Sequence, residues 1–247
     1  MRRVRVIPTL LISNGKLVKT IKFKKPTYIG DPVNAVKIFN DKEVDEIVLL
    51  DITATKEKRE PDYDKIEEIC SEAFMPFAYG GGINSVDQVD RLFQLGIEKV
   101  VLNSVLNSKL NLVRQISDKY GAQSVVASID VRKNIFGKYS AYSHSGQKKV
   151  RLVMEQYLSN ILKAGVGEVF LNAIDRDGTY LGYDLELINK LSKNSSVPLV
   201  ACGGARNVTD FKLAIENGAS AAAAGSMFVY SKKNGGILIT YPSSLKL

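Results

Sequence analysis

Residues 78–84 read Ala-Tyr-Gly-Gly-Gly-Ile-Asn, and residues 200–206 read Val-Ala-Cys-Gly-Gly-Ala-Arg. Each stretch is typical of a buried strand that ends in a glycine turn and leads into a helix. Gly81 and Gly82 recur as Gly203 and Gly204, at an offset of 122 residues. Because 122 is close to half of the 247 residues, the repeat predicts two copies of one half-unit.

The repeat extends beyond the glycine turns. The same offset of 122 residues relates 100–104, which end in Asn-Ser, to 222–226, which end in Gly-Ser. It also relates Gly15-Lys16 to Gly137-Lys138. Glycines between a strand and a helix expose backbone N–H groups to an anion. One such turn in each half predicts two phosphate sites. The alternative is that these glycines only supply the positive φ of a tight turn.

The spacing of apolar residues predicts strands that alternate with helices. Strands are expected at 4–12, 46–51, 76–79, 100–102, 124–130, 168–173, 197–201 and 220–224. Helices are expected after Asp31-Pro32, at 66–73, from Val86, and at 110–120, 150–164, 184–193 and 209–217. Short apolar strands separated by helices are typical of parallel strands that are covered on the outside.

Eight such units in one chain predict an α/β fold, a single (β/α)8 TIM barrel over residues 1–247 with an internal half-barrel repeat. An open doubly wound sheet is the alternative, but it leaves the half-repeat unexplained. In a barrel, functional residues gather at the C-terminal ends of the strands.

Composition excludes several classes of function. No apolar stretch follows the basic start Met1-Arg2-Arg3 and no run reaches membrane-spanning length, so a soluble cytoplasmic protein is expected. Two cysteines, Cys70 and Cys202, and the single His144 leave no set for a zinc site or a Ser-His-Asp triad. No bound metal is expected.

The net charge of +8 is spread along the chain. The sequence shows no recognition helix, zinc finger or aromatic RNA-binding platform. A nucleic-acid partner is therefore not expected despite the positive net charge. A phosphorylated small substrate explains the charge equally well, and a solvated basic face is the alternative.

Several motifs resemble the cyclase subunit of imidazole glycerol phosphate synthase, a histidine-biosynthesis enzyme, over nearly the whole chain. They are Asp-Ile-Thr-Ala-Thr at 51–55, Gly-Gly-Gly-Ile at 80–83, Asn103-Ser104, Ile129-Asp130, Asp-Arg-Asp-Gly-Thr at 175–179, Gly-Tyr-Asp-Leu at 182–185 and Gly203-Gly204. The resemblance implies a (β/α)8 barrel that forms a heterodimer with a glutaminase subunit. It also implies no cofactor and a substrate with a phosphate at each end, which ammonia attacks after travelling up the barrel axis.

The resemblance assigns roles to individual residues. It implies one phosphate at Gly81, Gly82, Asn103 and Ser104, and the other at Gly203, Gly204, Gly225 and Ser226. It implies substrate contacts from Lys19, Asp51 and Asp177, with Gly178 and Thr179 beside Asp177. Asp130 matches one of two aspartates that act as general acid and base.

The position of the second aspartate is occupied by Leu11. The internal repeat leads to the same conclusion. Leu11 of the first half aligns with Asp130 of the second half if the turn that follows is three residues longer in the second half. A hydrocarbon cannot transfer a proton, and losing a proton-transfer group typically costs about 10²- to 10⁴-fold in rate. Efficient cyclase chemistry is therefore not expected.

Arg5, Glu46, Lys99 and Glu168 fall at the N-terminal starts of four predicted strands. In the family these charges form a ring around the ammonia entrance, beside the surface that binds the glutaminase. The alternative is a set of strand-end charges that are solvated, or paired for stability.

The C-terminal stretch 235–242, Gly-Gly-Ile-Leu-Ile-Thr-Tyr-Pro, does not resemble the amphipathic last helix of the histidine enzyme. It is similar to the tail of paralogues in bacterial surface-polysaccharide pathways, which are associated with a glutaminase and a sugar amidotransferase that makes acetamidino sugars. This chain is therefore expected to receive ammonia and pass it on. The alternatives are a genuine cyclase that uses another base, and a non-catalytic scaffold that binds sugar phosphates.

Overall fold

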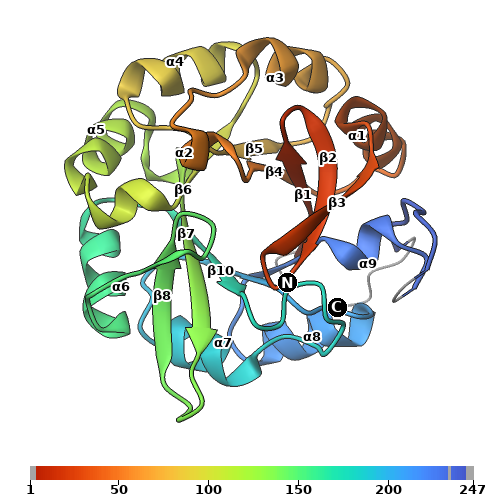
Figure 1. Cartoon of the computed structure of the whole chain (residues 1–247). Helices are drawn as coiled ribbons and strands as arrows, with labels where there is room; N and C mark the ends of the chain where they lie inside the picture. The colour runs from red at the N-terminus through yellow and green to blue at the C-terminus, as the bar shows by residue number, and fades with distance from the viewer. Residues whose placement is uncertain (1–3, 233–234, 243–247) are drawn as a thin grey trace.

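The computed structural model describes residues 4–232 and 235–242, so the basic start Met1-Arg2-Arg3 lies outside it. Eight parallel strands form the barrel: β1 (Arg5–Ser13), β4 (Ile47–Asp51), β5 (Phe77–Gly80), β6 (Lys99–Leu102), β7 (Val125–Lys133), β10 (Glu168–Ala173), β11 (Leu199–Cys202) and β12 (Ala221–Ala224). Each strand pairs with the next, and β10 also pairs with β7, which closes the sheet (Figure 1). The predicted (β/α)8 barrel is confirmed, and an open sheet is excluded.

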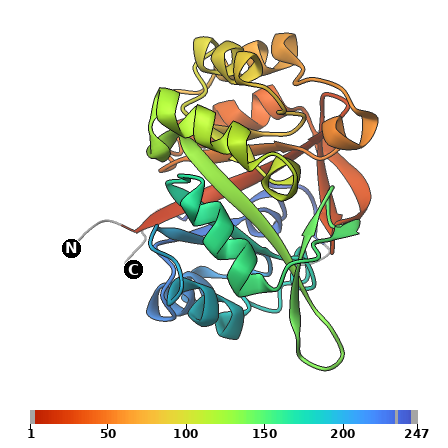
Figure 2. The ribbon, with the colours of Figure 1, turned by 90° about the vertical axis from the view of Figure 1, so that its left-hand side faces the viewer.

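Helices cover the outside of this barrel (Figures 1 and 2). The longer ones are α1 (Pro32–Asp41), α3 (Tyr63–Cys70), α4 (Val86–Gln94), α5 (Leu110–Tyr120), α6 (Met154–Lys163), α7 (Leu185–Ser192) and α8 (Val208–Glu216). Short turns of helix are α2 (Ala54–Glu57), α9 (Ser226–Val229), η1 (Ser104–Asn107) and η2 (Ala122–Ser124). Asp31, Ser85 and Asp184 accept backbone N–H bonds as N-caps, which fixes where α1, α4 and α7 begin.

Two expected helices have different bounds in the structure. The helix predicted at 150–164 begins only at Met154, because the N–H of Val150 bonds to Ala141 at the sheet edge and Val153 is extended. The helix predicted at 66–73 begins one turn earlier, at Tyr63, because Asp62 caps it. In both places a backbone or side-chain bond, rather than the apolar spacing, sets the boundary.

A hairpin rises from the first strand of each half. β2 (Lys16–Ile21) and β3 (Lys24–Gly30) extend β1, while β8 (Tyr139–Ser143) and β9 (Lys148–Lys149) extend β7. Two non-glycine residues with positive φ form the outer turn of each hairpin: Lys22 and Phe23 at 52° and 62°, His144 and Ser145 at 54° and 55°. These turns are 122 residues apart, so the sequence repeat is also a structural repeat.

Strand register defines the equivalence of Leu11 and Asp130. Leu11 pairs with Leu50 on the neighbouring β4, and Asp130 pairs with Asn172 on the neighbouring β10. Leu50 and Asn172 are 122 residues apart, so Leu11 and Asp130 occupy the same place in the two halves. The predicted three-residue difference in turn length is confirmed.

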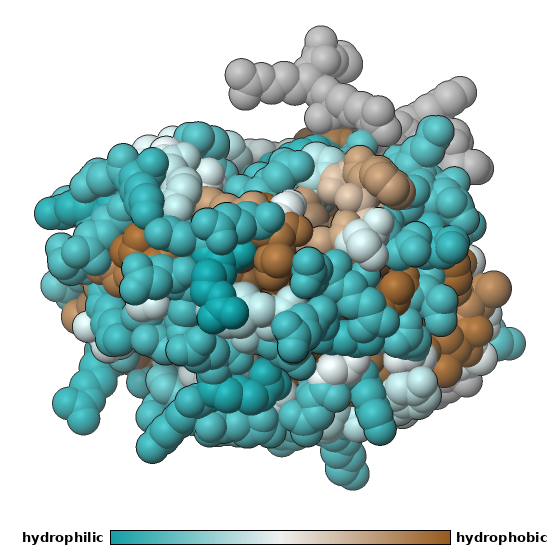
Figure 3. Space-filling view, turned by 90° about the horizontal axis from the view of Figure 1, so that it is seen from above, coloured by the Kyte–Doolittle hydropathy of each residue, from teal (hydrophilic) through white to brown (hydrophobic). Residues whose placement is uncertain are grey.

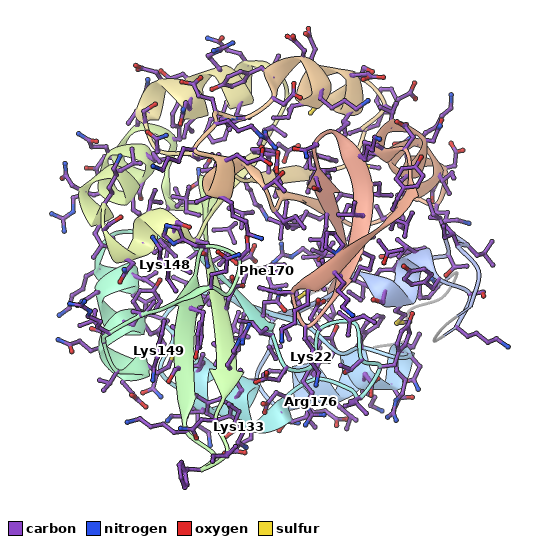
Figure 4. The ribbon with its side chains drawn as sticks, in the orientation of Figure 1. Lys22, Lys133, Lys148, Lys149, Phe170 and Arg176 are labelled. Carbon is purple, nitrogen blue, oxygen red and sulfur yellow. The ribbon has the colours of Figure 1, made fainter. Side chains whose placement is uncertain are left out.

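Two apolar layers hold the barrel together. The inner cluster lines the lumen and consists of Ile7, Val48, Ala78, Val101, Val126, Phe170, Val200, Cys202, Ala221 and Ala223. Phe170, the largest member, is 1% exposed and points into the lumen (Figure 4). The second layer lies between strands and helices, whose outer side is mostly hydrophilic (Figure 3). Within the described residues no helix is long and apolar enough to cross a membrane.

The described part of the C-terminal tail, 235–242, contains no helix, as the sequence predicted. The N–H groups of Leu238 and Thr240 bond to carbonyls at the end of α9, and the hydroxyl of Tyr241 donates to the carbonyl of Val6 at 3.0 Å. The Tyr241 ring lies 5.5 Å from that of Phe228. An extended strap therefore packs against the end of α9 and the start of β1.

Candidate functional site

Four charged side chains close the floor of the barrel. Arg5 contacts the carboxylates of Glu46 and Glu168, and the Nζ of Lys99 lies 2.7 Å from Glu46 and 3.4 Å from Glu168. The glutamates are almost fully buried, so they depend on these cations for compensation. Burial opposes the charge on Arg5, but its bonds with Glu168 and Glu46 outweigh burial and raise its pKa. The four residues thus form one closed ring of ion pairs.

A cavity opens at the other end of the barrel, at the C-terminal ends of the strands. Leu11 and Asp130, from opposite halves, both line it. The Leu11 side chain points into this mouth, so no proton-transfer group occupies the place equivalent to Asp130. Asp51 and Asp177 are the other carboxylates among the described residues that line the cavity.

Asp130 lies in the wall of this cavity and is 6% exposed. Its described side-chain partner is Asn103, whose Nδ2 donates to Oδ2 at 3.2 Å. Burial, and to a smaller extent the nearby charge of Asp177, together raise the pKa of Asp130 to about 7. A carboxyl group with this pKa can act as either proton donor or acceptor near neutral pH.

Lys19 and Asp177 form a buried ion pair at the mouth. Nζ of Lys19 donates to Oδ1 of Asp177 at 3.0 Å and to the carbonyl of Thr20 at 2.9 Å, and the lysine is 5% exposed. The N–H of Lys22 also bonds to the carbonyl of Asp177, which ties the β2–β3 turn to the loop after β10. The charge of Asp177 is therefore compensated, unlike that of Asp130.

Asp51 is engaged by neighbours on its own side of the mouth. Its Oδ1 accepts bonds from the N–H groups of Thr53 and Ala54 at the start of α2, at 2.9 and 3.0 Å. Its Oδ2 accepts a bond from Arg59 at 2.8 Å. The sequence did not single out Arg59, because a surface arginine eight residues away carries no local signal of this contact.

The first predicted phosphate site, which we call the first anion cradle, faces the cavity. Gly81, Gly82, Asn103 and Ser104 all line it, as does Thr55, whose hydroxyl lies 3.4 Å from the N–H of Gly82. Gly82 has a φ of 73°, and an added Cβ would meet the carbonyl of Arg59 at 2.7 Å, so the turn requires glycine. The Ser104 hydroxyl accepts a bond from the N–H of His144 at 3.3 Å, which brings the β8–β9 turn over this cradle.

The second predicted phosphate site, which we call the second anion cradle, does not open into the central cavity except at Gly225. Gly203, Gly204 and Ser226 are buried, and the N–H of Gly182 bonds to the carbonyl of Gly204 at 2.9 Å. The hydroxyl of Tyr180 donates to the carbonyl of Ser226 at 2.9 Å. Gly225 lines the central cavity, and the Lys19 side chain packs against it. Ser226 instead lines a separate groove, together with Gly178 and Thr179. The Lys19–Asp177 pair thus separates the central cavity from this cradle.

Sequence reasoning also missed polar atoms inside the barrel. Thr9 and Asn172 line the cavity at 5% and 6% exposure, and Oγ1 of Thr9 and Oδ1 of Asn172 have no hydrogen-bond partner in the described residues. A signal did exist, since inward positions on β1 and β10 alternate with outward ones. Cys202 lies in the same wall, but burial raises its pKa to about 12, so it is a neutral thiol. The described residues contain no group that could hold a metal ion.

Comparison with known proteins agrees with this architecture. The sequence profile of the family described as Histidine biosynthesis protein matches residues 5–234. The chain belongs to this family. A Pseudomonas aeruginosa protein, provisionally named imidazole glycerol phosphate synthase subunit hisF2, is 47% identical over 248 residues, covering 100% of this chain and 99% of the relative.

Two further relatives place the chain among the HisF-like cyclase subunits. A Vibrio vulnificus protein, provisionally named imidazole glycerol phosphate synthase subunit hisF3, is 46% identical and covers 98% of this chain and 94% of the relative. The HisF subunit of imidazole glycerol phosphate synthase from Streptomyces griseus is 38% identical over 225 residues, 91% of this chain and 90% of that protein.

Proposed function

We propose that this HisF-like chain receives ammonia from a glutaminase subunit at the barrel floor and passes it through the mouth to an acceptor enzyme. The observation that carries the proposal is the combination of a complete floor ring with Leu11 in the place equivalent to Asp130. Passage of ammonia needs the floor ring but does not need a second proton-transfer group at position 11.

The floor ring supports passage of a small neutral molecule. Arg5 and Lys99 each bridge Glu46 and Glu168, so one cation can release its contacts while the other holds the glutamates. Above the ring, the lumen is lined by apolar side chains, which favour neutral ammonia over ammonium. The unpartnered oxygens of Thr9 and Asn172 then offer acceptors to ammonia near the mouth.

The apolar side chain at position 11 argues against efficient cyclisation. General acid and base catalysis of the cyclase reaction would need a second group that exchanges protons opposite Asp130. Leu11 and its neighbour Leu50 supply hydrocarbon there, and Asp177 is compensated by Lys19. We infer a sugar amidotransferase as the acceptor, one that converts an acetamido group to an acetamidino group during surface-glycan synthesis. The described part of the tail, residues 235–242, contains no helix, and this supports the assignment.

A genetic experiment tests the physiological role. Deleting the gene should abolish the amidino sugar and leave growth without histidine unchanged. Complementation with the wild-type gene should restore the sugar, and a Glu46→Gln, Glu168→Gln double variant, which breaks the floor ring, should restore much less. A histidine requirement after deletion contradicts the proposal.

A genuine cyclase is the second candidate, because Asp130, with a pKa near 7, and Asp177 share one cavity. Steady-state turnover of the purified bisphosphate substrate with ammonium salt decides between the two. Turnover comparable to that of a histidine-pathway enzyme excludes the conduit proposal. A scaffold that binds sugar phosphates without catalysis predicts no complex with a glutaminase, so co-purification with one dismisses it.

A further inference from the structure

The hairpin between β7 and β8 carries two large apolar side chains into solvent. Its tip, Asn134-Ile135-Phe136-Gly137, projects sideways from the barrel, away from the barrel axis, near the end at which β7 finishes (Figure 2). Ile135 is 93% exposed and Phe136 is 86% exposed. Single exposed apolar residues are common, but an adjacent Ile-Phe pair on a projecting tip is typical of an interaction site.

Hydrogen bonds hold this tip in one conformation. Oδ1 of Asn134 accepts the N–H groups of Phe136 and Lys138 at 3.0 and 2.9 Å, and the N–H of Gly137 bonds to the carbonyl of Asn134 at 3.0 Å. The exposed side chains therefore sit on an ordered turn rather than a loose loop. An ordered anchor loses less conformational entropy when it binds a partner.

The base of the hairpin is braced against α7. Lys133 forms an ion pair with Glu186 at 2.6 Å, and the hydroxyl of Tyr139 donates to Asp184 at 3.0 Å. The N–H of Lys133 bonds to Asp175 at 2.9 Å. The acids nearest the hairpin are thus already engaged within the chain.

Cations surround the same side of the mouth. Figure 4 shows Lys22, Lys133, Lys148, Lys149 and Arg176 along the second half of the mouth, from the β2–β3 turn, β7, β9 and the loop after β10. Lys22, Lys148 and Lys149 are exposed and form no ion pair among the described residues. We call these five residues the basic rim. It would attract an acidic surface during association.

We propose that the Ile135–Phe136 tip and the basic rim form the docking surface for an acidic protein that covers the mouth, the ammonia acceptor of the proposed function. The tip would enter an apolar socket and the rim would face carboxylates around that socket. Buried aromatic anchors inside a charged border are the usual source of affinity at protein interfaces. Covering the mouth also keeps ammonia away from bulk water, where it would be protonated.

A protein fits this surface better than an anionic membrane. Membrane binding grows with the apolar area that is buried, and two adjacent side chains on one turn offer little of it. A shaped protein socket can enclose both side chains. The experiment includes vesicles so that the membrane alternative is measured rather than assumed.

Binding of the chain, in complex with its glutaminase, to the purified sugar amidotransferase tests the proposal. The Ile135→Ser, Phe136→Ser double variant should weaken this binding at least tenfold. The matched control is Ile237→Ser, Leu238→Ser, an adjacent pair beside α9 that is 55% and 53% exposed, and it should bind as wild type does. Lys148→Glu, Lys149→Glu should slow association and reduce its dependence on salt.

Three outcomes would overturn the proposal. In the first, the tip variant binds the amidotransferase as tightly as wild type does. In the second, vesicles of phosphatidylcholine and phosphatidylglycerol bind wild type but not the tip variant, while amidotransferase affinity is unchanged, which assigns the tip to a membrane. In the third, wild type does not bind the amidotransferase at all.

A measurement of ammonia in the same mixtures keeps the two proposals distinguishable. If glutamine hydrolysis is stimulated by the chain and the ammonia escapes into solution, the conduit holds and the docking surface fails. If the chain does not stimulate the glutaminase, the proposed function itself fails. The tip variant should leave glutaminase stimulation unchanged, because the hairpin lies at the end of the barrel opposite the floor ring.

Discussion

The two half-barrels share one backbone plan and differ in what they present to the mouth. The first half carries an open anion cradle beside a hydrocarbon wall made by Leu11 and Leu50. The second half carries Asp130 and Asn172 at the equivalent places, and its predicted phosphate site does not open into the central cavity except at Gly225. At these equivalent places only the second half carries a carboxyl group, whereas only the first half has its glycine turn in the wall of the central cavity. The repeat preserves the fold, whereas single side chains decide the chemistry of each half.

Restoring the missing acid should produce the largest effect. Leu11→Asp places a carboxyl opposite Asp130 and should raise cyclase turnover by about 10²- to 10⁴-fold if that group alone is limiting. Steady-state assay with the bisphosphate substrate and ammonium salt measures the gain. Leu50→Asp, on the neighbouring strand, is the control and should give none. An unchanged rate in Leu11→Asp would show that the halves differ catalytically for another reason.

The lumen offers a second comparison, because Phe170 and Val48 occupy equivalent places in the two halves. Phe170→Ala should lower the free energy of unfolding by about 3–5 kcal/mol, through lost burial and the cavity left behind. Val48→Ala should cost about 2 kcal/mol, since it removes two methyl groups. Urea denaturation of both variants measures the difference. Equal losses would contradict the packing described for the inner cluster.

The titration of Asp130 should add a pH-dependent contribution to stability that Leu11, at the equivalent place, cannot make. Its pKa is about 7 when folded, raised from the model-compound value of 3.8, so the folded state holds this proton more tightly than the unfolded state. The resulting stabilisation is complete below pH 3.8 and is lost as the pH rises to about 7, at up to about 1.4 kcal/mol per pH unit.

Asp130→Asn should remove this contribution. Comparing the unfolding free energy of wild type and Asp130→Asn between pH 4 and pH 8 isolates it from the other titrating groups. The wild-type curve should fall relative to that of the variant as the pH rises. Parallel curves would mean that Asp130 is more solvated than its 6% exposure indicates.

The smallest effect concerns the second anion cradle. Tyr180→Phe removes the hydroxyl that donates to the Ser226 carbonyl and should cost about 0.5–1.5 kcal/mol of stability. Tyr180→Gly should also open this cradle, so calorimetric titration with inorganic phosphate should report one site in wild type and two in this variant. Two equivalent sites in wild type would remove the distinction between the halves.

Much of the fold could be predicted from sequence, because apolar periodicity and glycine turns are local signals. The 122-residue repeat of the Gly81-Gly82 turn predicted a barrel of two halves, and the family resemblance indicated a lost acid at position 11. The predicted strand bounds also placed four charged residues at the floor of the barrel, namely Arg5, Glu46, Lys99 and Glu168. Their closure into a ring of ion pairs needed the strand register, which no single segment contains.

The sequence by itself determined the barrel, its two halves and the chemical difference between Leu11 and Asp130, since these follow from local patterns and from their recurrence 122 residues later. Only the tertiary structure decided which polar groups are paired. Lys19 donates a hydrogen bond to Asp177, 158 residues away in the sequence, Arg59 donates one to Asp51, and Tyr180 donates one to the carbonyl of Ser226. The physical reason is that burial and charge compensation depend on distances through space, and these are set when the closed sheet brings remote loops together over one mouth.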